Sequence, residues 1–417
     1  MDRKKIVILG CSFAGLTAAY ELKRRLGGGH DIVAVDASDS FTFIPSLIWV
    51  PFGWRKLSDI RFKLAPALKR RGIEFVHARA ARIDPDARCL ELQGADSPGK
   101  LGYDYLLIAT GPKIEFDVVP GLGPAAGQTV SICNGAHALE AGAQWDRFVQ
   151  APGPVIVGAT QGAACFGAAY EFVFNLEYAL RKLKIRKRAP VTYITSEPFA
   201  GHFGIGDLRY GEAMTKAFFR YTGIDWALNC VVERIENNRV YFRSGALHHW
   251  NEPDKPEDLA GRSLPFRYGM IIPPFLGIDA VRQAGLGNER GFIVTNDFFQ
   301  HLTRPEIFAA GVAVAVASPA PCEAGCAVSK TGYISEIMAK YAAINIAASI
   351  EGKPLRPKPT AEIDAGNQGM IMLTDRIYAP KKRRIELLVP GPWAHWVKLA
   401  FEKYFLWKMR TGHVEMP

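Results

Sequence analysis

The fold of this chain is decided by Ile6-Val7-Ile8-Leu9-Gly10-Cys11-Ser12-Phe13-Ala14-Gly15, near its start. The four apolar residues predict a short buried strand, and the glycines predict a tight turn into a helix that runs to Arg25. A second apolar run, residues 31–36, ends in Asp36. This order is typical of a βαβ unit that holds a dinucleotide, with the pyrophosphate at the helix N-terminus and the acid on the ribose hydroxyls. Ser12 stands where the middle glycine of the pattern is usual.

A second unit of the same kind follows later in the chain. Its turn is Gly158-Ala159-Thr160-Gln161-Gly162-Ala163-Ala164-Cys165-Phe166-Gly167. An apolar strand at residues 154–157 precedes this turn, a helix passing Glu171 follows it, and residues 191–195 predict the next strand.

The second turn differs from a nicotinamide site in two ways. Cys165 lies where the pyrophosphate of a nicotinamide cofactor would be held, and no acid follows the next strand until Glu197. Both features argue against nicotinamide binding and favour sulfur chemistry as the source of electrons. The alternative is that Cys165 is a small apolar residue that packs the helix on the strand.

Composition limits the classes of protein that the chain can represent. Its 417 residues predict two or three domains, and the hydrophobic content of 48% allows large cores. The net charge of +10 favours acidic partners, such as an anionic lipid surface or an anionic substrate. Because no Lys/Arg block alternates with aromatic residues, we expect no nucleic-acid partner. Residues 245–265 are polar and contain prolines, which predicts an exposed loop.

The seven cysteines are an odd number, and residues 1–5 lead directly into the first strand. We therefore expect no cleavable signal peptide and no framework of structural disulfides. Cys322 and Cys326 have no second cysteine or histidine pair nearby, so we expect no metal site. No run reaches the roughly 18–20 apolar residues of a membrane-spanning helix.

Two later segments are similar to the places where the chain leaves and re-enters the first domain of flavin disulfide reductase-like proteins. Residues 105–111 form an apolar strand that ends in Ala-Thr-Gly, and residues 305–311 end in Ala-Ala-Gly. Many relatives have an Asp directly after this last glycine, whereas this chain has Val312.

Motifs along almost the whole chain resemble those of bacterial-type sulfide:quinone oxidoreductases, and the flavoproteins of flavocytochrome c sulfide dehydrogenases have a similar core. The matching motifs are Phe43-Ile44-Pro45-Ser46 with Trp49, Ala109-Thr110-Gly111-Pro112-Lys113, Ser131-Ile132-Cys133 with His137, Gly162-Ala163-Ala164-Cys165-Phe166-Gly167, Ile194-Thr195-Ser196-Glu197-Pro198 with Gly201-His202, Tyr268-Gly269-Met270-Ile271-Ile272-Pro273, Lys330-Thr331-Gly332-Tyr333 and Ala400-Phe401-Glu402-Lys403-Tyr404-Phe405.

The resemblance implies an α/β fold with two Rossmann-like dinucleotide-binding domains of the flavin disulfide reductase type and a C-terminal amphipathic membrane-binding region. The implied domains are the first part of an FAD-binding domain at 1–112, a second Rossmann-like domain with the redox cysteine at 113–290, the FAD-binding return segment at 291–350, and a quinone and membrane region at 351–417. FAD is the implied cofactor. The residues expected to bind it are Gly10, Ser12, Gly15, Asp36, Thr110, Gly111, Gly311 and Lys330. Lys330 is expected to begin a helix and to approach the pyrimidine end of the flavin.

Three cysteines carry the sulfur chemistry of the family. Cys133 and Cys165 match the first two by their motifs. The third is missing, because the best-matching segment, residues 360–367, offers Ala361 or Ile363 at that position.

The remaining chemistry is assigned to the thiols themselves. We expect Cys165 to face the flavin, with its pKa lowered by the helix N-terminus, and Cys133 to be an auxiliary thiol that receives or passes on sulfur. Cys322 and Cys326 leave two alternatives open. One of them replaces the missing partner and forms a bridge with Cys165, or both are incidental.

Proton carriers are sought among residues near the two thiols. His137 follows Cys133 by four residues and shares its side if that stretch is helical. His202 is a second candidate, and Glu171 is a candidate base about a turn and a half beyond Cys165. The alternative for these side chains is an ordinary capping, surface or solvated role.

The C-terminal segment from Trp393 to Met409 has apolar and aromatic residues at helical spacing, and the basic block 381–384 precedes it. This pattern predicts an interfacial helix whose aromatic side chains enter lipid and whose lysines meet anionic headgroups. The alternative is an amphipathic helix that packs on the protein core. The residues expected at the quinone or the membrane are Trp393, Trp396, Phe401, Tyr404 and Phe405.

The leading interpretation is a peripheral membrane flavoenzyme that passes electrons from sulfide, or a related sulfur compound, through FAD to a membrane quinone, with a homo-oligomer allowed. One alternative is a flavoprotein that delivers electrons to a cytochrome c. Another is an FAD- and sulfur-binding membrane protein without turnover, which the missing third cysteine favours. A type II NADH:quinone reductase is least favoured, because Cys165 occupies the second turn.

Overall fold

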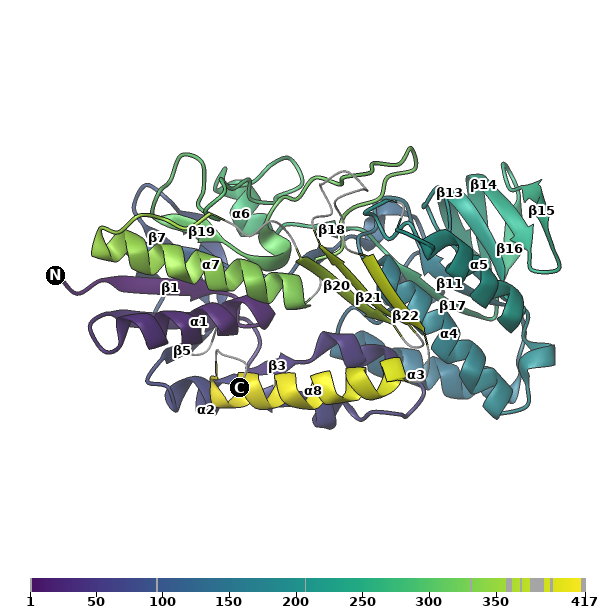
Figure 1. Cartoon of the computed structure of the whole chain (residues 1–417), viewed down its shortest axis with the longest axis horizontal. Helices are drawn as coiled ribbons and strands as arrows, with labels where there is room; N and C mark the ends of the chain where they lie inside the picture. The colour runs from purple at the N-terminus through teal and green to yellow at the C-terminus, as the bar shows by residue number, and fades with distance from the viewer. Residues whose placement is uncertain are drawn as a thin grey trace.

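The structure is a computed structural model that describes residues 2–94, 97–206, 208–330, 332–357, 362–367, 370–375, 386–390 and 393–413. It is built around two sheets whose central strands are parallel, with helices packed on them (Figure 1). The basic block 381–384 lies outside the described residues.

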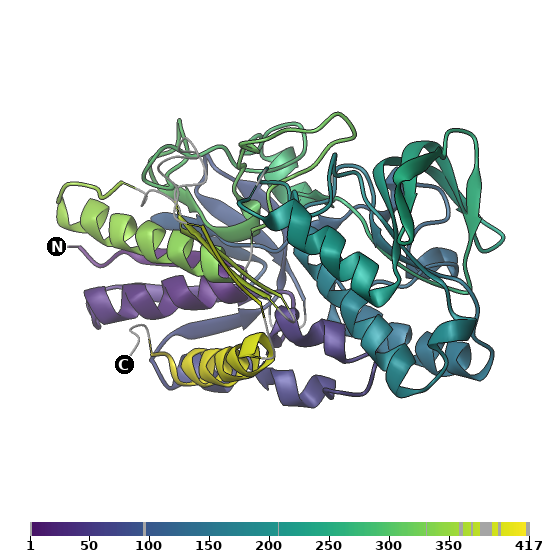
Figure 2. The same cartoon turned by 45° about the vertical axis from the view of Figure 1, so that its right-hand side comes forward.

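The first sheet contains the strand that opens the chain. Its strands pair in parallel in the order β19-β9-β1-β2-β5. The side chains of Ile6, Val7 and Ile8 are fully buried, as expected for a parallel sheet covered on both faces. Helices α1 and α7 pack side by side over this sheet (Figures 1 and 2). The bounds are β1 (Lys5–Leu9), α1 (Phe13–Leu26), β2 (Asp31–Asp36), β5 (Glu74–His77), β9 (Tyr105–Ile108), β19 (Ile307–Ala309) and α7 (Gly332–Glu351).

The second sheet is built on the second glycine turn. Strands β17, β11, β12 and β13 pair in parallel, and β13, β14 and β15 continue the sheet as antiparallel neighbours. The bounds are α3 (Gly135–Gln150), β11 (Val155–Ala159), α4 (Phe166–Lys182), β12 (Val191–Ile194), α5 (Gly211–Thr222), β13 (Asp225–Glu236), β14 (Arg239–His249), β15 (Glu252–Asp258), β16 (Ser263–Pro265) and β17 (Tyr268–Ile272).

The prediction of a loop at residues 245–265 is wrong, because this segment contains the end of β14 together with β15 and β16. A polar composition does not distinguish a loop from an exposed strand at the edge of a sheet. Strand β15 lies at the edge of the sheet, and most of its residues are exposed, so it needs no apolar alternation.

Smaller elements connect and cover the two sheets. The remaining strands are β3 (Ser40–Thr42), β4 (Arg61–Lys63), β6 (Arg79–Asp84), β7 (Cys89–Gln93), β8 (Lys100–Gly102), β10 (Lys113–Ile114), β18 (Phe275–Leu276), β20 (Glu362–Asn367), β21 (Met370–Asp375) and β22 (Glu386–Pro390). The remaining helices are α2 (Leu64–Lys69), α6 (Asp279–Gln283) and α8 (Trp393–Thr411), with 3₁₀ turns η1 (Ile44–Trp49), η2 (Leu57–Ile60), η3 (Phe116–Val118), η4 (Pro124–Ala126), η5 (Arg186–Arg188) and η6 (Gly311–Ala313).

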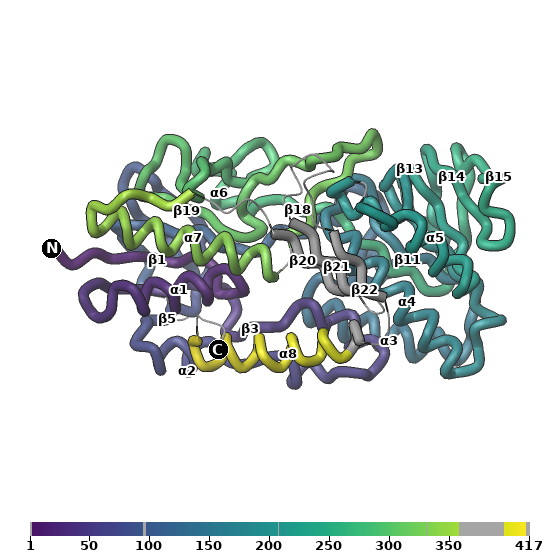
Figure 3. The backbone as a smooth tube through the Cα atoms, viewed as in Figure 1, coloured from purple at the N-terminus to yellow at the C-terminus, as the bar shows by residue number. Residues whose placement is uncertain are grey.

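The C-terminal helix α8 returns to the N-terminal half of the chain and runs beside α2 (Figure 3). The Tyr20 hydroxyl donates to the carbonyl of Met409 at 2.8 Å, and the Arg71 guanidinium donates to that of Thr411 at 2.8 Å. These contacts fix the end of α8 against α1 and the segment after α2. No helix among the described residues is long and apolar enough to cross a membrane.

The three domain boundaries drawn from the sequence, after residues 112, 290 and 350, remain our proposal for the division of the chain. The two sheets agree with it in one respect. Strand β19 joins the first sheet although it is separated from β9 by the whole second sheet, as a return segment at 291–350 requires.

Candidate functional site

The first glycine turn has the shape of a dinucleotide site. Gly10 has a φ of +102°, and a Cβ added to it would lie 2.5 Å from the carbonyl oxygen of Ala109. A Cβ on Gly15 would lie 1.6 Å from the carbonyl oxygen of Gly10. Both positions therefore require glycine, which brings the backbone of the turn close to the start of α1.

The start of α1 is open to an anion. Ser12 precedes the helix and makes no side-chain cap, so the first N–H groups of α1 have no partner within the helix. Asp36 accepts hydrogen bonds from the backbone N–H groups of Cys11 (2.5 Å) and Ser38 (2.7 Å), which hold its carboxylate at the end of β2. Burial raises the pKa of Asp36. A positive helix end beside an oriented carboxylate fits the pyrophosphate and ribose of FAD.

The other expected cofactor residues lie around the same sheet edge. Thr110 and Gly111 directly follow β9, and Gly311, with a φ of +72°, begins η6 beside Ala14 of α1. These positions surround the carboxyl ends of the parallel strands, where α/β sheets bind their ligands.

Lys330 binds backbone carbonyls. Its Nζ donates to the carbonyls of Val312 (3.0 Å) and Val314 (2.5 Å) and lies 4.6 Å from the centre of the Phe292 ring. Burial lowers the pKa of Lys330 to about 8. Val312 stands at the position of the Asp found in many relatives, and its backbone carbonyl accepts a hydrogen bond from Lys330. Helix α7 begins at Gly332, so the expectation that Lys330 begins it is wrong by two residues.

Cys165 and Cys133 lie together. Cys165 is the residue before α4, and Cys133 follows the segment that pairs with β17 at Val130. The segment before Cys133 and strand β11 before Cys165 both pair in parallel with β17, so the two cysteines follow strands that end at the same edge of the second sheet. Both are free thiols that keep part of their surface exposed. The structure therefore brings together the two cysteines that the motifs selected.

The prediction that the helix N-terminus lowers the pKa of Cys165 is wrong. Burial raises it to about 12, the neighbouring Cys133 raises it further, and a hydrogen bond with Ser329 lowers it. Burial likewise raises the pKa of Cys133 to about 11, and a hydrogen bond with Ser131 lowers it. Loss of water around the sulfur outweighs the helix dipole, because desolvation penalises the thiolate directly.

Cys322 and Cys326 form a disulfide with each other, with Cα atoms 5.8 Å apart. This overturns the expected bridge from one of them to Cys165. It also shows one disulfide in a chain in which we expected no framework of them. The bridge closes a loop at residues 322–326, and we call the segment 322–330, which continues from this loop to Lys330, the strap.

The strap lies on the second glycine turn. The N–H of Gly162 donates to the carbonyl of Gly325 at 2.7 Å, and the N–H of Ala327 donates to that of Ala163 at 2.9 Å. Because Cys322 and Cys326 are bonded to each other, neither has a free sulfur with which to bridge Cys165.

The second turn is closed to a nicotinamide cofactor. Gly162 already uses its N–H on the strap, and the side chain of Gln161 exchanges two hydrogen bonds with the backbone of Val232 (3.0 and 3.1 Å). Glu197, the acid after β12, is fully buried and accepts from the hydroxyls of Tyr170 (2.8 Å) and Thr195 (2.7 Å). Burial raises the pKa of Glu197 to about 7. Gly162, Gln161 and Glu197, which a nicotinamide cofactor would need in this turn, are therefore bonded to protein groups.

The two histidines occupy different settings. Asn134 caps α3 through the N–H of His137 (2.9 Å), so Cys133 lies before the helix and does not share a helical face with His137, as we had expected. The Nδ1 of His137 is buried and makes no hydrogen bond, and burial lowers the pKa of this ring. His202 is buried, its Nδ1 accepts from the N–H of Gly204 (3.2 Å), and a hydrogen bond joins its ring to the backbone of Ala320.

Helix α8 packs into the protein by one face. Phe405 is 1% exposed, and its ring lies 4.9 Å from that of Phe13 at the start of α1. The expectation that Phe405 meets the membrane is therefore wrong, because it fills the core of the first sheet. Phe401 and Tyr404 are half-buried, whereas Trp396 is 69% exposed. The side chain of Trp393 lies outside the described residues.

Charged residues of α8 also point inward. Lys398 forms an ion pair with Glu171 of α4, and its Nζ lies 4.5 Å from the centre of the Trp49 ring. Glu402 is fully buried and accepts from the Ser46 hydroxyl at 2.6 Å. Because Glu171 is paired with a lysine in the interior, it is neither solvated nor free to act as a base without that lysine.

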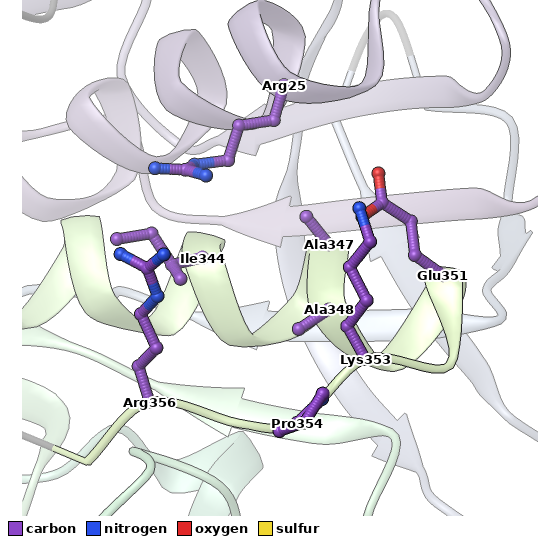
Figure 4. Close-up of a pocket in the computed structure, with 8 residues that line it drawn as sticks. All are labelled: Arg25, Ile344, Ala347, Ala348, Glu351, Lys353, Pro354 and Arg356. Atoms are coloured by element: carbon purple, nitrogen blue, oxygen red, sulfur yellow. The ribbon is translucent and has the colours of Figure 1, made fainter.

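A cavity of about 490 Å³ lies away from all of these groups (Figure 4). Arg25, Glu351 and Arg356 line it at the far ends of α1 and α7. Since α7 has 20 residues, its two ends lie about 30 Å apart, so this cavity does not belong to the thiol site.

The comparisons with known proteins agree with this geometry. The family model of pyridine nucleotide-disulphide oxidoreductases matches residues 4–331. A sulfide-quinone reductase of Aquifex aeolicus is 36% identical over 99% of this chain and 92% of its own length. The crystal structure of the Aquifex aeolicus sulfide:quinone oxidoreductase superposes with a TM-score of 0.87, at 35% identity and with coverage of 99% and 92%. A mitochondrial sulfide:quinone oxidoreductase of Mus musculus is 22% identical over 74% of this chain and 65% of its own length.

The chain belongs to the sulfide:quinone oxidoreductase family. The resemblance drawn from the motifs and the predicted fold class are thereby confirmed. The chain is an FAD-dependent oxidoreductase of the flavin disulfide reductase type.

Sequence reasoning missed several residues of the site in this sulfide:quinone oxidoreductase. Lys398 and Glu402 did give a signal: with Phe405 they recur at spacings of four and three residues, which puts them on one helical face. Phe405, the apolar residue of that face, indicates that the whole face is buried.

We expect Gly10→Ala to lose most of its FAD. The added Cβ would lie 2.5 Å from a carbonyl oxygen, and a positive φ alone costs a non-glycine residue about 1–2 kcal/mol. The FAD-to-protein ratio after gentle purification measures the effect. Gly28→Ala is the matched control, because nothing lies within 4 Å of the position of its Cβ. Full FAD content in Gly10→Ala would contradict the assignment of this turn.

A mass-spectrometric map of the resting protein should find Cys322 and Cys326 joined in one fragment. Cys165 should be absent from any bridge to either of them, since their sulfurs are bonded to each other and Cys165 is a free thiol. Digestion under non-reducing conditions, after alkylation of free thiols, gives the map. A fragment that joins Cys165 to Cys322 or Cys326 would restore the replacement hypothesis.

Proposed function

We propose that this chain oxidises sulfide at Cys133 and Cys165 and passes the electrons through FAD to a quinone. One observation carries the proposal. In and after the second dinucleotide turn, Gly162, Gln161 and Glu197 are bonded to protein groups, and Cys165 follows the turn at the same sheet edge as Cys133. The name of the Aquifex relative, a sulfide-quinone reductase, supports the same substrate and acceptor.

In the proposed reaction, hydrosulfide converts a disulfide between the two cysteines into a trisulfide. In the oxidised protein Cys133 and Cys165 share an S–S bond. Hydrosulfide attacks one sulfur and breaks this bond, which leaves a persulfide on one cysteine and a thiolate on the other. The thiolate and the persulfide then join as a trisulfide, with the release of one proton and two electrons. FAD, when bound, supplies the two-electron acceptor.

The residues of the chain have separate tasks in this reaction. Gly10, Ser12, Gly15 and Asp36 would hold the dinucleotide part of FAD, and Lys330 fixes η6 by its carbonyls. His137 has an unpartnered buried Nδ1 and is the group we assign to accept the released proton. The lowered pKa of His137 keeps its ring neutral and able to accept it. His202 holds its loop through two backbone contacts.

We further propose that the outward face of α8 lies on an anionic membrane surface from which the quinone enters. Trp396, Ala400, Lys403, Trp407 and Arg410 are exposed and follow one another at spacings of four, three, four and three residues. Aromatic side chains with interleaved cations on one stripe are typical of a helix that lies in the membrane interface. The homo-oligomer that the sequence allows stays a prediction, and delivery to a cytochrome c stays the alternative to quinone that the names of the relatives do not favour.

Cys165→Ser should retain FAD and lose flavin reduction by sulfide, by a factor on the order of a hundred or more, because the sulfur that breaks and re-forms the bond is gone. Anaerobic titration with sulfide, followed by flavin absorbance, measures the loss. Cys89→Ser is the matched control, since Cys89 lies on β7 in the first half of the chain. Dithionite should reduce the flavin in both variants. Sulfide reduction at the normal rate in Cys165→Ser would overturn the proposal.

Replacing Trp396 and Trp407 by Ser should weaken binding to anionic vesicles by at least about tenfold, since each exposed indole that enters the interface contributes more than 1 kcal/mol. Flotation with vesicles containing an anionic lipid measures the binding. Trp250→Ser is the control, because Trp250 is also exposed (45%) and lies in the turn between β14 and β15. Equal flotation of both variants would contradict the membrane assignment.

A further inference from the structure

A strongly basic segment lies at the end of α4 and in η5, and the proposed reaction gives it no task. Residues 181–188 contain six cations and no acid. Arg181 and Arg186 pair with Glu177, at 2.9 and 3.7 Å. The other four cations are exposed and have no ion-pair partner in the part of the chain that the structure describes. We call them the basic cluster: Lys182, Lys184, Lys187 and Arg188.

The backbone of this segment is held in place by the residues between the cluster cations. The last turn of α4 closes through a hydrogen bond from the N–H of Ile185 to the carbonyl of Leu180 at 3.0 Å. Ile185 is buried, and the Arg186 guanidinium donates to the carbonyl of Gly223 at 2.7 Å. Because Ile185 and Arg186 are bound to the protein, the cluster presents its charges to solvent from a fixed backbone.

Lys184 occupies a backbone position that suits glycine. Its φ is +58°, in the left-handed region where helices usually end on a glycine, because a Cβ is disfavoured there. The ammonium group of Lys184 makes no hydrogen bond or ion pair with the described residues, so no contact within them offsets this cost. We therefore expect the charge of Lys184 to act on a partner outside the chain.

The basic cluster is connected to the outward face of α8 by a short path of contacts. The Nε of Arg55 lies 3.2 Å from the carboxylate of Glu402 on α8. The next ring along the chain, that of Trp54, lies 5.7 Å from the ring of Tyr178 on α4, and Tyr178 precedes Lys182 by about one helical turn. In both views the end of α4 and helix α8 lie on the lower side of the molecule (Figures 1 and 2).

Exposed apolar side chains lie among these cations. Leu183, between Lys182 and Lys184, is 47% exposed, and Tyr178 is 50% exposed. A nucleic acid would satisfy the charges but not Leu183. An anionic lipid surface satisfies both, since apolar side chains enter below its headgroups.

We propose that the basic cluster is a second membrane contact of this chain, which binds anionic lipid headgroups beside the outward face of α8. The inference rests on the proposed function, which places α8 on the same surface. A single helix in the interface leaves the molecule free to tilt about the helix axis, whereas a second contact to one side of the helix fixes this tilt. The two contacts also differ in kind, because the cluster binds mainly by charge and α8 also by its indole rings.

The test is flotation of the FAD-loaded full chain with vesicles that contain phosphatidylglycerol. The triple variant Lys182→Gln, Lys184→Gly, Lys187→Gln should bind at least about tenfold more weakly at low salt, because three charges near the surface are lost. At about 1 M salt, where the Debye length is about 3 Å, the difference from the wild type should nearly vanish. The weaker binding of the Trp396→Ser, Trp407→Ser variant should persist there, since the loss of apolar contact is not screened.

A matched control removes the same charge elsewhere. Arg88 is also exposed and has a positive φ, of +49°, in the turn between β6 and β7. The variant Lys5→Gln, Arg88→Gly, Lys100→Gln therefore loses three exposed cations and relieves one left-handed residue, as the test variant does. It should float as the wild type does. Thermal melting and FAD content should show that both triple variants are folded, and Lys184→Gly alone should melt no lower than the wild type.

The outcomes separate this inference from the proposed function. If the test variant binds as tightly as the wild type, or no more weakly than the control variant, the cluster is not a membrane contact. Unchanged vesicle binding with weaker retention on heparin than the control variant would assign the cluster to another polyanion and overturn the inference. If the test variant alone binds weakly while the Trp396→Ser, Trp407→Ser variant floats normally, the inference is supported and the assignment of α8 fails. Sulfide reduction of the flavin, measured without vesicles, tests the proposed oxidation separately.

Discussion

The hydrogen bond from the N–H of Gly162 to the carbonyl of Gly325 determines what kind of site the second half of the molecule can form. In a nicotinamide-binding turn this N–H faces the pyrophosphate. Here it holds a neighbouring loop instead, and Gln161 and Glu197 are likewise bound to protein groups. With these groups engaged, the turn lacks the partners that a nicotinamide cofactor needs, and Cys165 remains as its reactive side chain.

The C-terminal helix shows how burial of charge can fix an orientation. Lys398 with Glu171 and Lys408 with Glu336 are ion pairs in the interior, and Glu402 is fully buried. Buried pairs add little net stability over apolar residues, but separating one leaves an uncompensated charge that costs about 3–5 kcal/mol. Helix α8 can therefore rotate about its axis only by breaking several of them. These buried charges therefore keep the exposed residues of α8, from Trp396 to Arg410, on the outside of the molecule.

Local patterns predicted the first βαβ unit, the second turn and its cysteine, because each depends on residues within a few positions of one another. The roles of Gly10 and Gly15 could be predicted from the geometry of a single turn. The face of α8 that points inward could not be predicted in this way, because it is set by contacts with residues more than two hundred positions away, such as that of Lys398 with Glu171. The pKa of Cys165 was mispredicted for a related reason. A helix N-terminus is visible in the sequence, whereas the loss of water around a sulfur depends on every segment packed over it.

Burial of the two thiols has opposite effects on the steps in which they take part. A raised pKa makes a thiolate a poorer leaving group, so the opening of the S–S bond by hydrosulfide is slowed. The same raised pKa makes the thiolate, once formed, a stronger nucleophile and electron donor toward its acceptor. Burial therefore slows the first step and favours the second, so the extent to which the packed segments exclude water from the two sulfurs sets the balance between the two steps.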